Sequence, residues 1–296
     1  MLRTIAGLAV AAFGGAFAVP AVPADAAVSV QIVAHFDLAT RQQPENITLE
    51  PDGSADVTFA GAGQVARVHP DGRTEILATF PAGGSAGGIV RTSDGTLYVN
   101  YRGATQTGVW RIRPGQAPAL FAALPDAKFP NGLALGPCDL YVTDSAAGAV
   151  WRVPLSGATP TLWAQGGELS PRTPTTFGSN GVKVHDAAVW VSNTDFGTLL
   201  RIPIRRDGSA GTIETKATGI GGIDDFAFEG NSVLAALNPF SEVIRVLPDG
   251  SHETVLTAGD GLRNPTSVAV RGNSAYVASA AYFTRDDPNL LKARVR

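Results

Sequence analysis

Residues 133–153, LALGPCDLYVTDSAAGAVWRV, decide the fold, because they hold three short apolar runs separated by turn residues. The runs are Leu133–Leu135, Leu140–Val142 and Val150–Val153, and residues such as Gly, Pro, Asp and Ser stand between them. Runs of this length, rich in Val, Leu and aromatic residues and bounded by turn formers, are typical of β-strands. The stretch therefore predicts three consecutive antiparallel strands.

The same unit recurs along the chain. Copies of its first run begin at residues 47, 89, 133, 182, 226 and 268, at intervals of 42 to 49 residues. In each copy the third run places a basic residue after two apolar ones. These third runs are Val65–Val68, Val109–Ile112, Val150–Val153, Leu199–Ile202, Val243–Val246 and the degenerate Leu290–Ala293. A period of this length favours propeller blades over an open solenoid or two sandwiches.

The two ends of the chain complete the repeat. Turns such as Pro70-Asp71-Gly72 lead from the third run into a fourth strand in five repeats, whereas the sixth repeat reaches the C-terminus without one. An additional strand, residues 28–36, precedes the first repeat. In a closed ring this strand completes the last blade and leaves no bare sheet edge. We therefore predict an all-β, six-bladed β-propeller with four antiparallel strands per blade, closed by the N-terminal strand.

The N-terminus predicts export. An apolar run over residues 5–19 follows Arg3, and Ala24-Asp25-Ala26 supplies the small residues that a signal peptidase recognises. The run is shorter than the roughly 20 residues that a spanning helix needs. We expect a signal peptide over residues 1–26, a single propeller domain over 27–296, a secreted protein, and no membrane attachment once the signal is removed. Cys138 is the single cysteine, so an internal disulfide is excluded.

Charge excludes two classes of partner. The net charge is -3 and Lys and Arg are not clustered, whereas nucleic acid and anionic lipid call for basic patches. We interpret the basic residue that recurs in each repeat as a structural pairing between blades. A small-molecule substrate and a monomeric protein are the expectations that remain.

Candidate site residues stand two positions before the apolar pair of each first strand, where a propeller brings six segments to one mouth of its channel. They are Glu45, Gly87, Asn131, Asn180, Asp224 and Thr266. Two carboxylates and two carboxamides offer the oxygen ligands that calcium prefers, with water completing the shell. Asn before Gly is also a common turn former, which is the alternative explanation. Glu45 is a poor turn residue and favours a metal site.

The segments around these residues resemble the gluconolactonase family, also called the SMP-30 or regucalcin family, and its diisopropylfluorophosphatase and paraoxonase relatives. They are Pro44–Ile47, Pro130–Leu135, Ser179–Val182 and Ile223–Phe226, and the resemblance covers nearly the whole mature chain. In that family a glutamate, two asparagines and an aspartate at these places bind a divalent cation, usually calcium. The resemblance implies that Glu45, Asn131, Asn180 and Asp224 are the metal ligands here.

Three departures from the family pattern limit what the resemblance implies. Asp225 stands where other repeats have Gly132 and Gly181. The segment before Asn131 lacks the arginine that sugar-lactone hydrolases of the family carry there, and no histidine dyad of the paraoxonase type can be assigned. The resemblance therefore does not specify a sugar acid lactone or an aryl ester.

The sequence leaves three functions open. The leading hypothesis is a secreted, calcium-dependent hydrolase of a lactone or a related ester or phosphotriester, with Asp224 or the adjacent Asp225 as the catalytic carboxylate that activates water or attacks directly. A non-catalytic exported propeller could instead bind a ligand or a protein at the mouth. A cyclase or condensing enzyme on the same scaffold is the third possibility, since propellers host unrelated functions.

Overall fold

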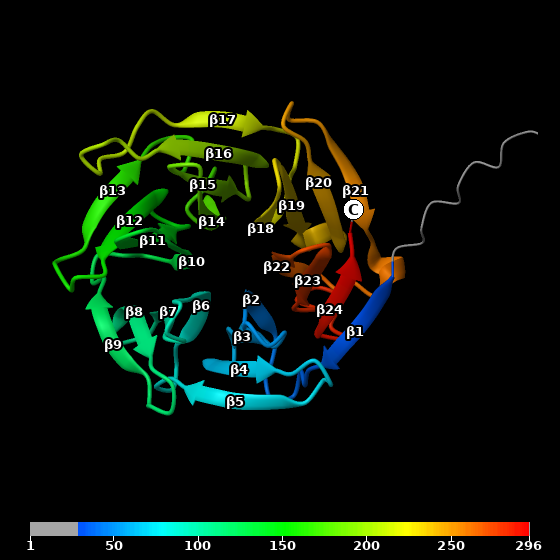
Figure 1. The fold of residues 1–296 in the computed structure, drawn as a ribbon. Helices are drawn as coiled ribbons and strands as arrows, with labels where there is room; N and C mark the ends of the chain where they lie inside the picture. Colours follow the sequence, from blue (N-terminus) through cyan, green and yellow to red (C-terminus); the bar gives the residue numbers. More distant parts are fainter. Residues whose placement is uncertain (1–28, 296) are drawn as a thin grey trace, which may run out of the picture.

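The computed structural model describes residues 29–295, which form six four-stranded antiparallel sheets around a central channel (Figure 1). The first three blades are β2 (Pro44–Leu49), β3 (Ala55–Phe59), β4 (Gln64–Val68), β5 (Thr74–Thr79); β6 (Ser85–Arg91), β7 (Leu97–Arg102), β8 (Thr107–Ile112), β9 (Ala119–Ala123); and β10 (Pro130–Leu135), β11 (Asp139–Asp144), β12 (Ala149–Pro154), β13 (Thr161–Gln165). The predicted six-bladed propeller is confirmed. The predicted signal peptide, residues 1–26, lies outside the described residues.

The remaining blades follow the same order, with two short 3-10 helices, η1 (Asn238–Phe240) and η2 (Ala258–Asp260), beside the fifth. Their strands are β14 (Ser179–His185), β15 (Ala188–Asn193), β16 (Thr198–Pro203), β17 (Glu214–Ala217); β18 (Ile223–Glu229), β19 (Ser232–Leu237), β20 (Glu242–Val246), β21 (His252–Leu256); and β22 (Pro265–Arg271), β23 (Ser274–Ser279), β24 (Asn289–Arg294). In the described part of the chain, no helix has the length and apolar character needed to cross a membrane.

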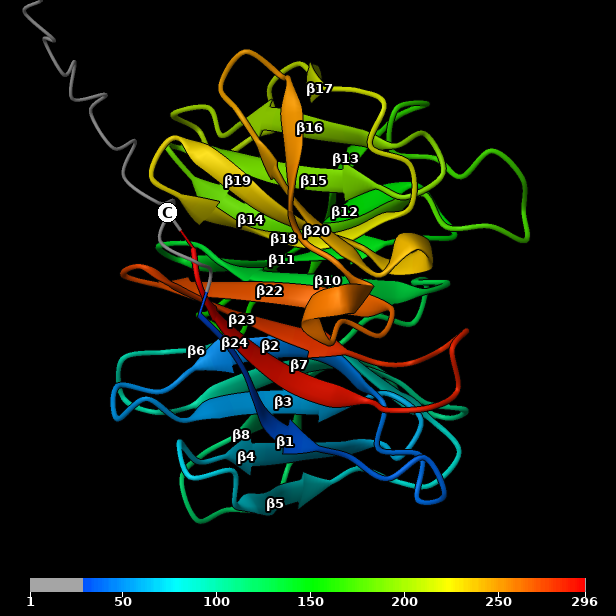
Figure 2. The same cartoon turned by 90° about the vertical axis from the view of Figure 1, so that its right-hand side faces the viewer.

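The ring closes through the N-terminal strand, as predicted. β1 (Val30–His35) pairs antiparallel with β24, and the sheet runs in the order β1-β24-β23-β22 (Figure 2). The outer edge of β24 would otherwise expose unpaired backbone groups, which favour aggregation. The sixth blade is therefore formed by the N-terminal strand β1 together with the three last strands, β22 to β24.

Apolar side chains from neighbouring blades pack against each other and form the core. One such cluster joins Val65 and Phe80 of the first blade to Ile89 and Trp110 of the second. Second strands are buried on both faces, as in β3 and β11, whereas fourth strands such as β5 are mostly exposed to solvent. This packing fixes the first strand of each blade against the channel, where β2, β10, β14 and β18 lie in Figure 1.

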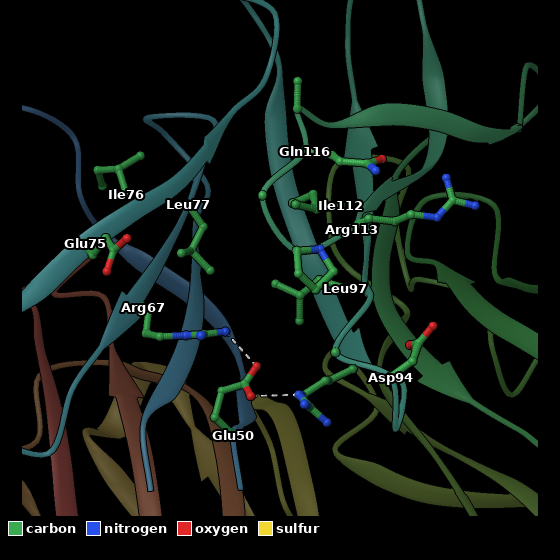
Figure 3. A pocket seen from close by; sticks show the side chains of 15 residues that line it. Glu50, Arg67, Glu75, Ile76, Leu77, Asp94, Leu97, Ile112, Arg113 and Gln116 are labelled. Atoms are coloured by element: carbon green, nitrogen blue, oxygen red, sulfur yellow. Dashed lines mark hydrogen bonds and ion pairs between the residues drawn. The ribbon is translucent and has the colours of Figure 1, made fainter. Parts of the chain in front are cut away.

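The repeated basic residue pairs within its own blade, so the expected pairing between blades is wrong for these residues. Arg67 Nε donates to Asp56 Oδ1 at 2.8 Å. Arg67 Nη2 donates to Glu50 Oε1 at 2.7 Å, and this contact is drawn in Figure 3. Glu50 then links this blade to the next through Arg91 at 2.8 Å. Other pairs within one blade are Arg152–Asp139, Arg201–Glu214 and Arg245–Glu229. Asp56 and Asp139 lie on the neighbouring second strands and Glu214 lies on a neighbouring fourth strand, because the third strand stands between these two.

Candidate metal centre at the mouth of the ring

Irregular pairing at the start of the first strands positions the candidate residues. The register between first and second strands shifts between Pro44 and Asn46, and corresponding shifts occur in the third, fourth and fifth blades. The candidate residues Glu45, Asn131, Asn180 and Asp224 each fall within one of these shifts, and Gly132, Gly181 and Asp225 fall beside the last three of them. An extra residue of this kind breaks the alternation of a strand and redirects a side chain. The asparagines therefore lie in strands and are not turn formers.

The four predicted ligands come together. Glu45, Asn131, Asn180 and Asp224 all line one cavity of about 480 Å³ at the mouth of the channel. Of the two other positions named by the repeat, Gly87 lines the cavity but adds no ligand side chain. Thr266 is fully buried and donates to the backbone oxygen of Pro44 at 3.0 Å.

Hydroxyl groups of the adjoining loops set the orientation of both carboxamides. Asn131 Nδ2 donates to Ser145 Oγ at 3.1 Å, and Asn180 Nδ2 donates to Thr194 Oγ1 at 3.0 Å. Ser145 and Thr194 donate their own hydrogens to backbone carbonyls of the next blade, at 2.6 and 2.7 Å, so toward the asparagines they can only accept. The amide nitrogens must face these hydroxyls, which leaves both carbonyl oxygens available as ligands.

The two carboxylates at the mouth lack a cationic partner, since within residues 29–295 no Arg or Lys forms an ion pair with Glu45 or Asp224. Burial raises the pKa of Glu45, the charge of Asp225 adds to this, and a hydrogen bond from Tyr282 opposes it. Burial also raises the pKa of Asp224 well above its usual range, with the charges of Glu45 and Asp225 adding and hydrogen bonding with Asn180 opposing. A bound cation would relieve this unfavourable ionisation.

Tyr282 was not found from the sequence. Its hydroxyl donates to Glu45 Oε2 at 2.5 Å. Burial, the charge of Glu45 and the hydrogen bond to it raise the pKa of Tyr282 well above its usual range, so the phenol stays protonated and remains a donor. Tyr282 thereby holds one oxygen of Glu45 and leaves the other free.

Asp225 occupies a different environment from Asp224. Its two carboxylate oxygens lie 2.7 and 2.8 Å from Lys183 Nζ, and Oδ2 also accepts from Ser267 Oγ at 2.7 Å and Asn46 Nδ2 at 3.1 Å. A Cβ at Gly181 would lie 2.4 Å from Asp225 Oδ1, so the glycine of the fourth blade makes room for this carboxylate. Asp225 lines no part of the mouth cavity and is almost fully buried.

The donor set fits a hard divalent cation. In the described part of the chain, no group of three or more His, Cys, Asp or Glu side chains is arranged to hold a metal ion. A site here therefore depends on the amide oxygens of Asn131 and Asn180 together with Glu45 and Asp224. Such all-oxygen sets suit calcium, which accepts six to eight ligands and tolerates irregular geometry.

Two arginines from other parts of the fold line the mouth cavity, although none stands directly before Asn131. Arg102, the last residue of β7, lies with its guanidinium carbon 4.4 Å from the ring centre of Phe129 and lines the mouth cavity. Arg285 reaches the same cavity from the loop between β23 and β24. None of the histidines lines it, in keeping with the absence of a paraoxonase-type dyad.

Comparison with known proteins establishes the fold. No family model and no curated protein sequence matches the chain. Among solved structures, a gluconolactonase from Xanthomonas campestris superposes with a TM-score of 0.71 at 15% identity, covering 92% of this chain and 91% of that one. Regucalcin from Agrobacterium tumefaciens, described as a calcium-binding protein, gives 0.69 at 16% identity over 90% and 95%.

A structure of a different activity has the same fold. Virginiamycin B lyase from Staphylococcus aureus, solved with quinupristin, gives a TM-score of 0.61 at 16% identity and covers 91% of this chain and 100% of that one. The predicted likeness to gluconolactonase and regucalcin is therefore confirmed at the level of the propeller. Chemistry has to be argued from the residues of the site.

Proposed function

We propose that this chain is an exported, calcium-dependent hydrolase that opens a lactone or cleaves a related ester or phosphotriester at the mouth of the ring. One observation carries the proposal. Two carboxylates without a cationic partner among residues 29–295, Glu45 and Asp224, share a cavity with two carboxamide oxygens of fixed orientation. The shared fold with a gluconolactonase and with calcium-binding regucalcin supports the choice of ester chemistry and of metal.

The residues have separate roles in this proposal. Glu45, Asn131, Asn180 and Asp224 would hold the cation, and Tyr282 keeps the Glu45 carboxylate in position. A bound calcium ion supplies Lewis-acid polarisation of the carbonyl or phosphoryl oxygen of the substrate.

Asp224 is the proposed general base, because its carboxylate faces the cavity and is not neutralised by a basic side chain of the described chain. It accepts the proton of the attacking water as the new bond from oxygen to carbon or phosphorus forms. It returns that proton to the leaving oxygen when the ester bond breaks. Catalysis by Asp225 stays a prediction, and its ion pair with Lys183 favours a role in supporting the floor of the site.

The experiment compares Glu45→Gln and Asp224→Asn with the wild type. Calcium affinity is measured by calorimetry, and turnover on γ- and δ-lactones and aryl phosphotriesters. Loss of a direct ligand charge should weaken calcium by more than about tenfold in both variants, and Asp224→Asn should abolish turnover. Arg152→Ala, within the third blade and away from the mouth, should change neither.

Two outcomes separate the alternatives. Calcium binding that depends on Glu45 and Asp224, without turnover of any ester, would favour the non-catalytic binding propeller or the cyclase. No calcium binding by the wild type would overturn the metal site itself.

Export and the nature of the partner belong to the same proposal. The signal peptide lies in residues 1–26, and a mature protein recovered from the medium with Ala27 as its first residue would support it. We propose a monomer acting on a small molecule, which sedimentation of the mature protein tests directly.

A further inference from the structure

Two arginines of the mouth cavity have no role in the proposed hydrolysis. Arg102 ends β7 and Arg285 lies in the loop between β23 and β24, yet both line the cavity that contains Glu45 and Asp224. Within residues 29–295, neither guanidinium group forms an ion pair or a hydrogen bond. Unpaired guanidinium groups in a concave site are suited to bind an anion from solution.

Stacking holds Arg102 in place. Its guanidinium lies over the face of Phe129, 4.4 Å from the ring centre. Phe129 in turn packs edge-on against Phe177, with ring centres 5.2 Å apart. A planar guanidinium on an aromatic face keeps its N–H groups directed outward around its edge, so the group is ready to bind a carboxylate with two hydrogen bonds.

Hydrogen bonds and an ion pair hold the loop that carries Arg285. Asn264 Oδ1 accepts from the backbone N–H groups of Phe283 and Thr284, both at 2.9 Å, and Arg263 Nε pairs with Asp286 at 2.9 Å. Arg285 itself has φ of 57°, a left-handed conformation that costs free energy for any residue with a side chain. Such strain, held by surrounding contacts beside a cavity, is a feature of ligand-binding sites.

The apolar lining of the cavity that holds the two arginines includes Phe129, Phe177 and Phe283, together named the phenylalanine wall. Phe177 and Phe283 are 44% and 67% exposed, and both line the cavity with Phe129. Exposed aromatic rings around a pocket lose contact with water when an apolar ligand covers them, which favours binding. The cavity therefore joins an apolar wall to two cationic groups.

Charge balance decides the sign of the ligand. Lys183 neutralises Asp225 below the cavity, and a divalent cation would balance Glu45 and Asp224. The charges of Arg102 and Arg285 are then left in excess. We propose that the cavity selects an organic anion whose carboxylate is bound by the two arginines and whose flat apolar ring lies against the phenylalanine wall. This inference rests on the proposed function, because the ester to be cleaved would lie beneath the ring, near Asp224.

The test measures binding of 2-naphthoate and of its neutral isostere 2-naphthamide to the mature protein by calorimetry. The decisive titrations contain saturating calcium, because the cation is needed to balance Glu45 and Asp224. The arginine variants then separate binding of the probe by Arg102 and Arg285 from binding of the probe by calcium. We expect the wild type to bind the acid at least about tenfold more tightly than the amide, and Arg102→Ala or Arg285→Ala each to remove most of this preference. Arg102→Lys keeps the charge but cannot form a bidentate contact with a carboxylate. It should therefore retain part of the preference for the acid that Arg102→Ala loses.

Arg172→Ala is the matched control. The guanidinium carbon of Arg172 lies 4.7 Å from the ring centre of Phe196, a stacking like that of Arg102 on Phe129. Arg172 does not line the cavity. This variant should keep the full preference for the acid. Equal affinity of the wild type for naphthoate and naphthamide would overturn the proposal, and so would an equal loss in Arg172→Ala. Melting temperatures of all variants confirm that they fold.

Turnover distinguishes this inference from the proposed function. Hydrolysis of neutral lactones without a preference for naphthoate would leave the hydrolase standing and remove the anion site. Arginine-dependent preference for naphthoate, in a protein that hydrolyses no ester, would support the anion site and overturn the hydrolase.

Discussion

Two acidic clusters of this propeller, one half-buried and one buried, differ in how their charge is balanced. At the mouth, Glu45 and Asp224 have no arginine or lysine partner in the described chain. At the other end of the first blade, Arg67 binds both Glu50 and Asp56, and Arg91 of the second blade also binds Glu50. Figure 3 shows Glu50 with its contact to Arg67. The cavity beside this second cluster is larger, about 650 Å³. Charge balance rather than cavity size therefore distinguishes the candidate site.

Burial acts on the acids of both clusters in the same direction. It raises the pKa of Asp56 to about 6, although Arg67 lies close and opposes the shift. It raises the pKa of Asp224 well above its usual range, where no basic side chain opposes it. Arginines balance the cluster of Glu50 and Asp56, whereas no basic side chain of the described chain pairs with the carboxylates at the mouth.

The sharpest test compares neighbouring residues, Asp224 and Asp225. Asp225→Asn should destabilise the protein by about 3 kcal/mol, because it leaves the partly buried charge of Lys183 without its partner. Asp224→Asn should instead stabilise the calcium-free protein, since it removes an unbalanced, half-buried charge. Urea unfolding in EDTA measures both.

The double variant Lys183→Met with Asp225→Asn checks the cause. It should recover part of the stability lost in Asp225→Asn, because no unpaired charge then remains. If Asp225→Asn kept full stability and lost turnover alone, Asp225 would act on protons and would belong to the functional cluster.

Calcium should have the next largest effect. A ligand that binds the folded state stabilises it by about 2.7 kcal/mol at a hundredfold excess over its dissociation constant. The melting temperature should rise by several degrees in millimolar calcium and return to its starting value in EDTA. Glu45→Gln should reduce this rise strongly, whereas Glu50→Gln, in the paired cluster, should retain it. A similar rise in both variants would place the cation elsewhere.

Arg67→Met tests the structural cluster. It leaves the buried carboxylate of Asp56 without its ion pair, although Glu50 keeps Arg91. We expect a loss of about 2 kcal/mol in the free energy of unfolding and no change in calcium affinity. Arg113→Met is the control, since Arg113 lines the same cavity and is exposed to solvent. A loss of calcium affinity in Arg67→Met would show that the clusters are coupled.

The sequence predicted the repeat, the ring closure and the four residues Glu45, Asn131, Asn180 and Asp224 that the structure brings to one cavity. The positions of these features follow from two properties of the sequence, the apolar alternation within each strand and the period of the repeat. The start of each first strand was placed too late, at Leu133 instead of Pro130 in the third blade, because the irregular pairing interrupts the apolar alternation.

Residues supplied by the ends of the second strands were missed. Ser145 and Thr194 follow β11 and β15 directly, and Arg102 ends β7, because each second strand finishes beside the start of a first strand. The repeat held this information, since these positions correspond in successive blades. Tyr282 and Arg285 could not be found in this way, because they lie in a loop whose length is specific to the last blade.

The smallest expected effect concerns pH and isolates the charge of Asp224. Its pKa in the folded protein lies above the ordinary value of 3.8 because of burial and then of Glu45 and Asp225. A carboxyl group of this kind contributes its full stability below pH 3.8 and loses it as the pH rises through the folded pKa, since the folded state must then ionise a buried group. In EDTA, the wild type should therefore lose stability relative to Asp224→Asn from about pH 4 upward, by at most about 1.4 kcal/mol per pH unit.

Asp56 titrates in both proteins and cancels in the difference. Urea unfolding at a series of pH values measures it, and calcium at neutral pH should reverse its sign, because the wild type alone keeps the full set of ligands. Parallel stability curves in EDTA would mean that Asp224 is balanced like Asp56, and the contrast between the two clusters would fail.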